Sequence, residues 1–335
     1  MNKVLVTGAS GMLGSRVCFD LIKQGYQVSA LLTGPQRRST LDAFLLAYGD
    51  ESVSHSIRPV YGELSNPDEL SEACKGIDFI VHCAAKVSFH KKDRLLLREV
   101  NVLGTRNLVN AALFNKVPRF THVSSVAAIP ASLPFKTKKP FLMGGRTPYS
   151  YYGLTKYRSE LEVWRGREEG LIVNIVRPAV ILGPGDWKTG SSALVGRMAR
   201  GMRFVSPGST GFIDVRDASA AILHTLKHPQ DASLLVLNSW NDRYEDFFRS
   251  LSAHLKVSAA GLVAGRGMAN LLCFAEYILE SVTGRKALLT PETVRSAFSV
   301  KEYPVELERV LPGFQYTSRE DSLTWLAALY HARPA

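Results

Sequence analysis

A tyrosine and a lysine four residues apart are the side chains of this sequence best suited to acid–base chemistry. Tyr152 and Lys156 lie within residues 150–169, whose pattern predicts a helix, so the two side chains share one helical face. A free tyrosine titrates near pH ~10, and a neighbouring ammonium group stabilises the phenolate and lowers that pKa. Tyr152 would then serve as a general acid and base near neutral pH. Such a pair is common by chance, so its meaning depends on the surrounding residues.

Further polar residues lie where they could complete a site for hydride transfer. Ser124 and Ser125 end a predicted strand, and either hydroxyl could donate to a substrate carbonyl oxygen as negative charge develops there. Asn101 lies on a long predicted helix over residues 95–115 and could hold a water molecule that passes the proton on. His82 lies inside an apolar strand, where a packed histidine is more common than a catalytic one.

The N-terminal segment predicts the elements that would hold a dinucleotide. Residues 3–7 are typical of a buried strand and residues 15–24 of an amphipathic helix, and between them stand Gly8, Gly11 and Gly14. Glycines permit a tight turn, and the N–H groups and dipole at a helix N-terminus favour a pyrophosphate. The spacing is G-x-x-G-x-x-G rather than the G-x-G-x-x-G of most Rossmann dehydrogenases. The strand–turn–helix context therefore predicts a dinucleotide cofactor.

The end of the second predicted strand, over residues 26–32, bears on the choice between NAD and NADP. An acidic residue at that place would hold the ribose hydroxyls and favour NAD. The sequence has no acid there before Asp42, but it has Arg37 and Arg38. We therefore expect NADP(H), with NAD(H) as the alternative. A simpler interpretation is that both arginines are merely exposed at the start of a helix.

Strands and helices alternate along the first two thirds of the chain, which predicts an α/β fold with a doubly wound parallel sheet of the Rossmann type. We expect the dinucleotide-binding domain to comprise residues 1–180 and 212–238. A smaller, mainly helical substrate lobe would comprise residues 181–211 and 239–335. No repeat or flexible linker separates these parts, so the lobes should interleave.

The composition, net charge and cysteine spacing limit the classes of protein that fit this sequence. The chain has 335 residues, 46% of them hydrophobic, and a formal net charge of +11. Because a strand is predicted from residue 3, we expect no signal peptide, and since no run of about 18 uncharged apolar residues occurs we expect no transmembrane helix. The four cysteines form no C-x-x-C pair, so we expect reduced thiols in a cytoplasmic protein and no metal site. The basic residues are mostly dispersed and accompany no nucleic-acid motif, so we expect no nucleic-acid partner.

Taken together, these segments resemble the extended short-chain dehydrogenase/reductases, also called the NAD-dependent epimerase/dehydratase family. The matching motifs occur in the family's order over residues 3 to about 225, at positions 7–14, 82–85, 101–105, 124–125, 152–156, 177–185 and 212–217. This combination is specific, whereas the C-terminal third of the chain is only loosely similar to the family.

The resemblance implies roles for individual residues. Tyr152 would be the catalytic acid and base, Lys156 its partner and a ribose ligand, and Asn101 the relay residue. Ser125 matches the family's catalytic serine better than Ser124 does. Glu63 stands where the family usually has an aspartate that contacts adenine. The implied cofactor contacts are Gly8, Ser10, Gly11, Met12, Leu13, Gly14, Arg37, Arg38, Glu63, Leu64, Ala84, Ala85, Tyr152, Lys156 and Pro178.

Within the family the chain is most similar to the 3β-hydroxysteroid dehydrogenase and dihydroflavonol reductase branch, which acts on bulky apolar alcohols and ketones. Sugar-nucleotide enzymes usually carry an Arg-Asp pair where this sequence has Thr210 and Gly211, and residues 289–293 are similar to the apolar-substrate branch. The implied function is NAD(P)-dependent oxidation or reduction of a small molecule. The alternatives are a nucleotide-sugar 4-epimerase or dehydratase with tightly bound NAD, and a non-catalytic NAD(P)-binding scaffold or sensor.

The resemblance also implies how the protein associates. Relatives often pair through the helices that carry Asn101 and Tyr152, so we expect a homodimer. Contact between the C-terminal amphipathic helix and a membrane surface is a less favoured hypothesis.

Overall fold

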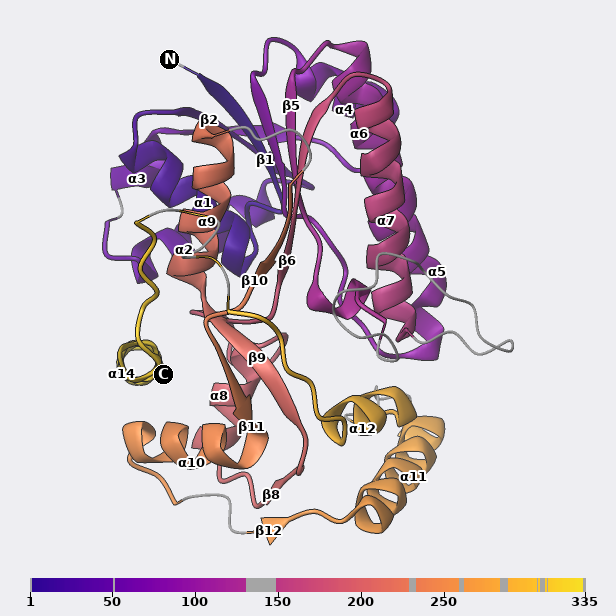
Figure 1. Ribbon diagram of the computed structural model, residues 1–335, viewed down its shortest axis with the longest axis vertical. Helices are drawn as coiled ribbons and strands as arrows, with labels where there is room; N and C mark the ends of the chain where they lie inside the picture. The colour runs from indigo at the N-terminus through magenta and orange to yellow at the C-terminus, as the bar shows by residue number, and fades with distance from the viewer. Residues whose placement is uncertain are drawn as a thin grey trace.

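The computed structural model describes most of the chain, namely residues 2–50, 52–130, 149–228, 233–258, 262–283, 289–305, 307, 311 and 313–333. A seven-stranded parallel sheet forms its larger part (Figure 1). The strands follow the order β10-β6-β5-β4-β1-β2-β3. Their bounds are β1 (Lys3–Thr7), β2 (Gln27–Leu32), β3 (Ile57–Tyr61), β4 (Phe79–His82), β5 (Arg119–Val123), β6 (Ile172–Pro178) and β10 (Ser233–Leu237).

This topology confirms the predicted Rossmann-type fold. Every neighbouring pair in the sheet is parallel, and the strand order reverses between β1 and β4. In such sheets ligands bind beyond the carboxyl ends of the strands, at the point of reversal. The central strands are rich in valine and isoleucine and are buried on both faces, as helices on both sides of a parallel sheet require.

Helices cover the two faces of the sheet (Figure 1). On one face lie α1 (Met12–Lys23), α2 (Gln36–Ala47), α3 (Ser52–His55) and α9 (Val215–Lys227), which share one apolar core with the sheet. On the other face lie α4 (Pro67–Cys74), α6 (Gly104–Phe114) and α7 (Tyr151–Glu168), which share a second core. Shorter helical segments are η1 (Lys91–Asp93), α5 (Arg94–Leu97), η2 (Arg98–Leu103) and η3 (Val126–Ala128).

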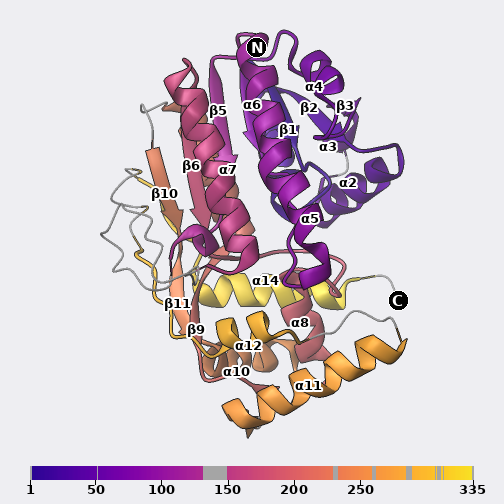
Figure 2. The same ribbon diagram turned by 90° about the vertical axis from the view of Figure 1, so that its right-hand side faces the viewer.

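A smaller lobe lies beyond the carboxyl ends of the parallel strands (Figures 1 and 2). It contains the three-stranded sheet β11-β9-β7 and the parallel pair β12-β8. Its elements are β7 (Val180–Leu182), α8 (Ser192–Ala199), β8 (Phe204–Val205), β9 (Ser209–Asp214), β11 (Trp240–Arg243), α10 (Tyr244–Leu255), β12 (Leu262–Val263), α11 (Arg266–Thr283), α12 (Pro291–Ala297) and α14 (Arg319–His331). Among the described helices, none combines the length and the apolar character needed to cross a membrane.

The two parts of the chain interleave in space. The predicted boundary at residue 212 falls inside β9, a strand of the smaller lobe's sheet, and α9 begins only at Val215. From the predicted substrate lobe, Leu307 and Leu311 are buried in the apolar core of α1, α2 and α9. We therefore keep the two-lobe division as a proposal, with this boundary moved to residue 215. All four cysteines are free thiols.

Candidate active site

The turn between β1 and α1 has the shape of an anion cradle. Gly8 has φ +68°, and a Cβ at this position would lie 2.6 Å from the backbone nitrogen of Ala84. A Cβ on Gly14 would lie 2.2 Å from the carbonyl oxygen of Gly8. Gly11 is the N-cap of α1, and no side chain caps the first turn. The N–H groups of this turn can therefore donate to phosphate oxygens, which fits the predicted dinucleotide.

A second glycine loop packs on this turn from the side of the smaller lobe. A Cβ on Gly183 would lie 3.1 Å from the sulfur of Met12, and the Ser191 hydroxyl lies 3.9 Å from the same sulfur. Of the other residues expected to contact the cofactor here, Ser10 is half-buried and Leu13 is buried. The two loops together close one end of the candidate cofactor site.

The two arginines expected at the cofactor phosphate have different environments. Arg38 donates from Nε to Asp42 at 2.9 Å, from Nη1 to the Ile57 carbonyl at 3.1 Å, and from Nη2 to Ser54. These bonds tie α2 to α3 and β3, so Arg38 has a structural role, and the phosphate contact expected for it stays a prediction. Arg37 is exposed, and its side chain makes no hydrogen bond or ion pair with any other described residue. Arg37 remains the candidate phosphate ligand.

The remaining predicted cofactor contacts follow the ends of β3, β4 and β6. Glu63 is exposed, and its carboxylate accepts from the Ser65 hydroxyl at 3.1 Å. Leu64 packs so closely on Gly104 that a Cβ there would lie 2.8 Å from the Leu64 Cβ. The carboxyl edge of the sheet also carries Ala84, Ala85 and Pro178. The fold thus gathers these residues along one edge, while their contacts with a cofactor stay predictions.

Tyr152 and Ser125 meet where α7 begins. A Cβ on Gly153 would lie 2.2 Å from the carbonyl oxygen of Ala127, so the missing side chain lets α7 approach η3. Ser150 caps α7 by accepting the Gly153 N–H at 2.9 Å. The Tyr152 hydroxyl lies near enough to Ser125 for that side chain to lower the Tyr152 pKa. Two hydroxyl groups therefore converge near the carboxyl end of β5, which is the arrangement that proton transfer to a carbonyl oxygen requires.

The Ser124 hydroxyl bonds to a buried carboxylate. Its hydroxyl donates to the Glu160 carboxylate, which also accepts from Arg177 Nε at 2.8 Å and Nη2 at 2.5 Å. Both Ser124 and Glu160 are buried. Ser125 therefore stays the candidate for contact with the substrate. Glu160 was not predicted as a site residue, although Tyr152, Lys156 and Glu160 recur every four residues and so lie on one face of α7.

The pKa values of Tyr152 and Lys156 are set mainly by burial. Burial raises the pKa of Tyr152 to about 12, and the nearby Ser125 side chain offsets only part of that rise. Lys156 donates to the Val123 carbonyl at 2.7 Å, and burial lowers its pKa to about 8 against the opposing effect of the Glu160 carboxylate. The predicted lowering of the Tyr152 pKa by Lys156 is therefore wrong for this structure, because the loss of water around the phenol outweighs it.

Asn101 connects the segment around Lys86 to α7 through its side-chain hydrogen bonds. The helix predicted over residues 95–115 contains the π-helical segment η2, in which Asn101 is buried. Its Oδ1 accepts the Lys86 N–H at 2.8 Å, and its Nδ2 donates to the Lys86 carbonyl and to Thr155 Oγ1, each at 3.0 Å. Thr155 in turn donates to the Tyr152 carbonyl at 2.8 Å. These bonds show that the Asn101 side chain helps to position α7, and the relay role expected for it stays a prediction.

His82 is a packed histidine, as predicted. Its Nδ1 lies 2.7 Å from Thr7 Oγ1 and its Nε2 lies 2.9 Å from Thr105 Oγ1. Burial lowers its pKa to about 3, so the ring stays neutral. His82 therefore joins β1, β4 and α6 behind the site.

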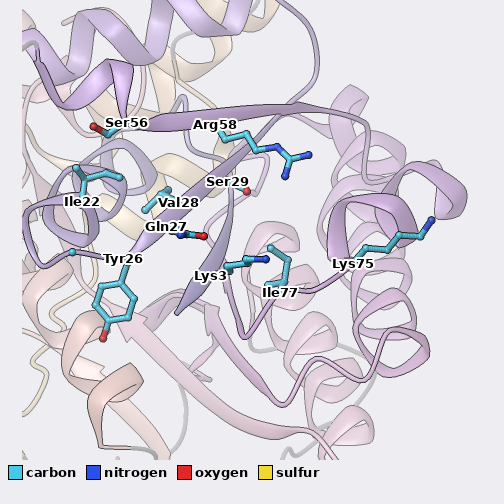
Figure 3. Close-up of a pocket in the computed structure, with 11 residues that line it drawn as sticks. Lys3, Ile22, Tyr26, Gln27, Val28, Ser29, Ser56, Arg58, Lys75 and Ile77 are labelled. Carbon is cyan, nitrogen blue, oxygen red and sulfur yellow. The ribbon is translucent and has the colours of Figure 1, made fainter. Parts of the chain in front are cut away.

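A separate hollow of about 450 Å³ lies at the opposite edge of the sheet (Figure 3). Lys3 and Gln27, which begin β1 and β2, line it together with Arg58 and Lys75. None of the residues predicted to bind the cofactor or to act in catalysis lines this hollow. The candidate active site is therefore the carboxyl edge, where the glycine turn, Ser125 and Tyr152 come together.

The sequence pattern of the NAD dependent epimerase/dehydratase family matches residues 4–237. The chain belongs to this family. The predicted resemblance to extended short-chain dehydrogenase/reductases is thereby confirmed, and with it the prediction of an enzyme from a nicotinamide-dependent family.

The chain is also similar to individual proteins named for sterol and dihydroflavonol chemistry. It is 33% identical over 224 residues to sterol demethylase protein B of Methylococcus capsulatus, a match that covers 65% of this chain and 64% of that protein. It is 30% identical over 269 residues to a provisionally named dihydroflavonol 4-reductase of Synechocystis, a match that covers 77% of this chain and 70% of that protein. Among solved structures, the crystal structure of gox2253 matches with a TM-score of 0.77 at 26% identity. The match covers 99% of this chain and 98% of the gox2253 chain.

Proposed function

We propose that this protein is an NAD(P)-dependent oxidoreductase that interconverts a secondary alcohol and a ketone on a bulky, apolar small molecule. The observation that carries the proposal is the pair of neighbouring side chains Tyr152 and Ser125, set on the same sheet edge as the Gly8 turn. The relatives named for sterol and dihydroflavonol chemistry support the choice of substrate class. The cytoplasmic location expected from the sequence stays a prediction.

The residues of this chain divide the chemistry among them. When bound, the nicotinamide supplies the hydride for reduction or accepts it in oxidation. Ser125 polarises the substrate oxygen, and Tyr152 donates its proton to that oxygen as negative charge develops there. With its pKa raised to about 12, Tyr152 holds its proton at neutral pH, which favours ketone reduction. Lys156 is mostly charged at neutral pH and suits the cofactor ribose hydroxyls.

The substitution Tyr152→Phe tests this proposal directly. It removes the proton donor and keeps the ring, so we expect cofactor affinity to stay within about twofold while turnover of apolar ketones falls roughly 10²- to 10⁴-fold. The measurements are fluorescence titration with NADPH and NADH, and steady-state turnover with a panel of cyclic ketones. Near-full activity in the variant would remove Tyr152 from the mechanism.

The epimerase alternative is favoured by the description of the family itself, which names epimerases and dehydratases. Such enzymes return the hydride to the same substrate in each cycle and keep their cofactor bound. Denaturing the freshly purified protein and identifying the released nucleotide by mass spectrometry separates the two functions. Stoichiometric NAD would favour the epimerase, whereas an empty protein that binds added NADPH reversibly supports the reductase. Cofactor binding without turnover of any carbonyl class would revive the scaffold hypothesis.

We infer that NADP(H) is the preferred cofactor, because Arg37 is an exposed cation near the end of β2 where no carboxylate would repel a 2′-phosphate. Arg37→Gln should raise the KM for NADPH about tenfold and leave that for NADH unchanged, since about 1.4 kcal/mol of phosphate contact is lost. Arg58→Gln, at an exposed arginine at the opposite edge of the sheet, is the matched control. Equal effects on both cofactors would contradict the inference.

A further inference from the structure

One end of the smaller lobe exposes a group of large apolar side chains. They lie on β8, β12 and α11, at the end of the molecule away from the parallel sheet (Figures 1 and 2). This apolar face consists of residues that are each 39% to 67% exposed, namely Phe204, Leu262, Val263, Met268, Leu271, Leu272, Phe274 and Leu279. The first two are cross-strand neighbours in the β12-β8 pair. A cluster of this kind on neighbouring elements marks an interaction surface more often than single exposed residues do.

The geometry of α11 shows that its exposed apolar residues are not part of the protein core. At about 100° per residue, one arc of roughly 160° around the axis of α11 contains its exposed apolar residues in the order Phe274, Leu271, Met268, Leu279 and Leu272. Ala269 and Cys273 lie on a different side of α11 and are buried in a small core shared with α12. Helix α11 therefore carries apolar residues on two sides, and α12 packs against only one of these sides.

Arginines flank the apolar face. Arg197, Arg200 and Arg203 are spaced three residues apart from the end of α8 to the start of β8, and Arg266 is the first residue of α11. All four are exposed, and within the part of the chain that the structure describes none of them forms an ion pair, while the Arg266 guanidinium lies 6.0 Å from the centroid of the Phe298 ring. Arg203 directly precedes Phe204, and its carbonyl accepts the Leu262 N–H at 3.2 Å. Positive charge and exposed apolar surface thus lie side by side.

The apolar face adjoins the candidate active site through α12. The Glu292 carboxylate of α12 accepts the backbone N–H of Tyr151, the residue before Tyr152. At its other end α11 is held by the ion pair between Glu280 and Lys92, with an N–O distance of 2.9 Å. Phe89, close to Lys92 in sequence, places its ring 6.1 Å from that of Tyr152. The inner side of the α11–α12 pair therefore covers the surroundings of the candidate proton donor.

We propose that the apolar face docks on an anionic membrane surface, with α11 in the interface and the four arginines against lipid phosphates. An apolar helical surface beside exposed cations that form no ion pair is the pattern of interfacial helices. A second copy of this chain fits less well, because a two-fold interface here would bring the same four arginines together across it. In one respect the inference rests on the proposed function: an apolar substrate held in the bilayer would reach Tyr152 from beneath α11.

Vesicle flotation of the full chain tests the proposal. With phosphatidylcholine vesicles containing phosphatidylglycerol we expect binding that weakens as salt rises, and with phosphatidylcholine alone much weaker binding. The double variant Leu271→Glu, Phe274→Glu should bind at least about tenfold more weakly, because two side chains lose apolar burial. Leu46→Glu is the matched control, since Leu46 is 60% exposed on α2 and Leu271 is 67% exposed. Arg203→Glu should weaken binding to anionic vesicles, whereas Arg58→Glu should not.

Two results would overturn the proposal. In one, the wild type does not float with either kind of vesicle. In the other, the double variant floats as well as the wild type does. A dimer that the double variant converts to a monomer, without vesicle binding, would assign the face to self-association. Flotation needs no turnover, and turnover of water-soluble ketones needs no vesicles. Failure of the membrane proposal and failure of the proposed oxidoreductase function are therefore distinguishable.

Discussion

Burial shifts the pKa values of Tyr152 and Lys156 in opposite directions and leaves both residues mostly protonated at pH 7. Because a buried charge is disfavoured, the pKa of the phenol rises to about 12 and that of the ammonium group falls to about 8. Glu160 and Cys83 raise the Lys156 pKa, and neither outweighs the loss of water. The site therefore holds a neutral proton donor, Tyr152, beside the Lys156 ammonium group, which loses its charge near pH 8, within the pH range of ordinary assays.

The first prediction is that ketone reduction declines above about pH 8. Lys156 loses its proton there, well below the pKa of about 10.4 expected for a free lysine. In Glu160→Gln the carboxylate that favours the charged lysine is gone, so the decline should begin at lower pH. The measurement is kcat against pH for both proteins, with thermal melting to establish that the variant is folded. A decline that begins only near pH 10 would contradict the assignment.

The second prediction separates the two neighbouring serines. Ser125→Ala removes the hydroxyl beside Tyr152, so kcat/KM should fall about 10²- to 10³-fold with little change in stability. Ser124→Ala leaves the buried Glu160 carboxylate without one donor, which should lower the free energy of unfolding by about 1–3 kcal/mol. Because Ser124 points to Glu160, that variant should keep most of its turnover. Chemical denaturation and steady-state kinetics give both readouts, and the reverse pattern would exchange the two roles.

At the scale of elements, the sequence predicted most strands and helices because their patterns are local. The strand over residues 57–61 matches β3, and the helix predicted over residues 150–169 matches α7 within one residue. The π-helical segment η2 was not predictable in this way. Asn101 in η2 bonds to Lys86 and Thr155, which are 15 and 54 residues away in the sequence. Likewise the carboxylate of Glu160 meets a serine 36 residues away, so no window of neighbouring residues reveals that contact.

The third prediction concerns the approach of α7 to η3. In Gly153→Ala the new Cβ would lie 2.2 Å from the Ala127 carbonyl oxygen, so α7 must move away from η3. That shift separates Tyr152 from Ser125, and we expect turnover to fall at least about tenfold because small displacements of reacting groups are costly. Gly267→Ala is the matched control, since Gly267 also lies near a helix start and has nothing within 4 Å of its Cβ position.

Kinetics and thermal melting of both glycine variants check this prediction. The control should keep its activity and gain a little stability, because alanine is the better helix former. If Gly153→Ala keeps full activity, the close approach of α7 to η3 does not position Tyr152.

At the scale of the whole molecule, the C-terminal segment joins the two lobes. The Thr317 N–H and hydroxyl donate to the Asp217 carboxylate of α9 at 2.9 and 2.7 Å. The Arg216 guanidinium stacks over the Trp325 ring of α14 at 4.3 Å from its centroid. The sequence did not predict these contacts, because each joins residues about 100 positions apart. The C-terminal third therefore helps to hold the smaller lobe against the sheet that carries the cofactor site.

The last prediction is that the protein forms a homodimer through α6 and α7. These helices lie side by side on the outer side of one sheet face (Figure 2), and they expose Phe114 at 80% and Leu161 at 48%. A two-fold pairing would bury both side chains, so light scattering at micromolar concentration should give about twice the chain mass. Leu161→Arg should yield a monomer, whereas Leu46→Arg on α2 should remain a dimer. Wild-type protein that is monomeric under these conditions would contradict the prediction. Since the apolar face lies on β8, β12 and α11, a dimer paired through α6 and α7 leaves it free for a membrane surface.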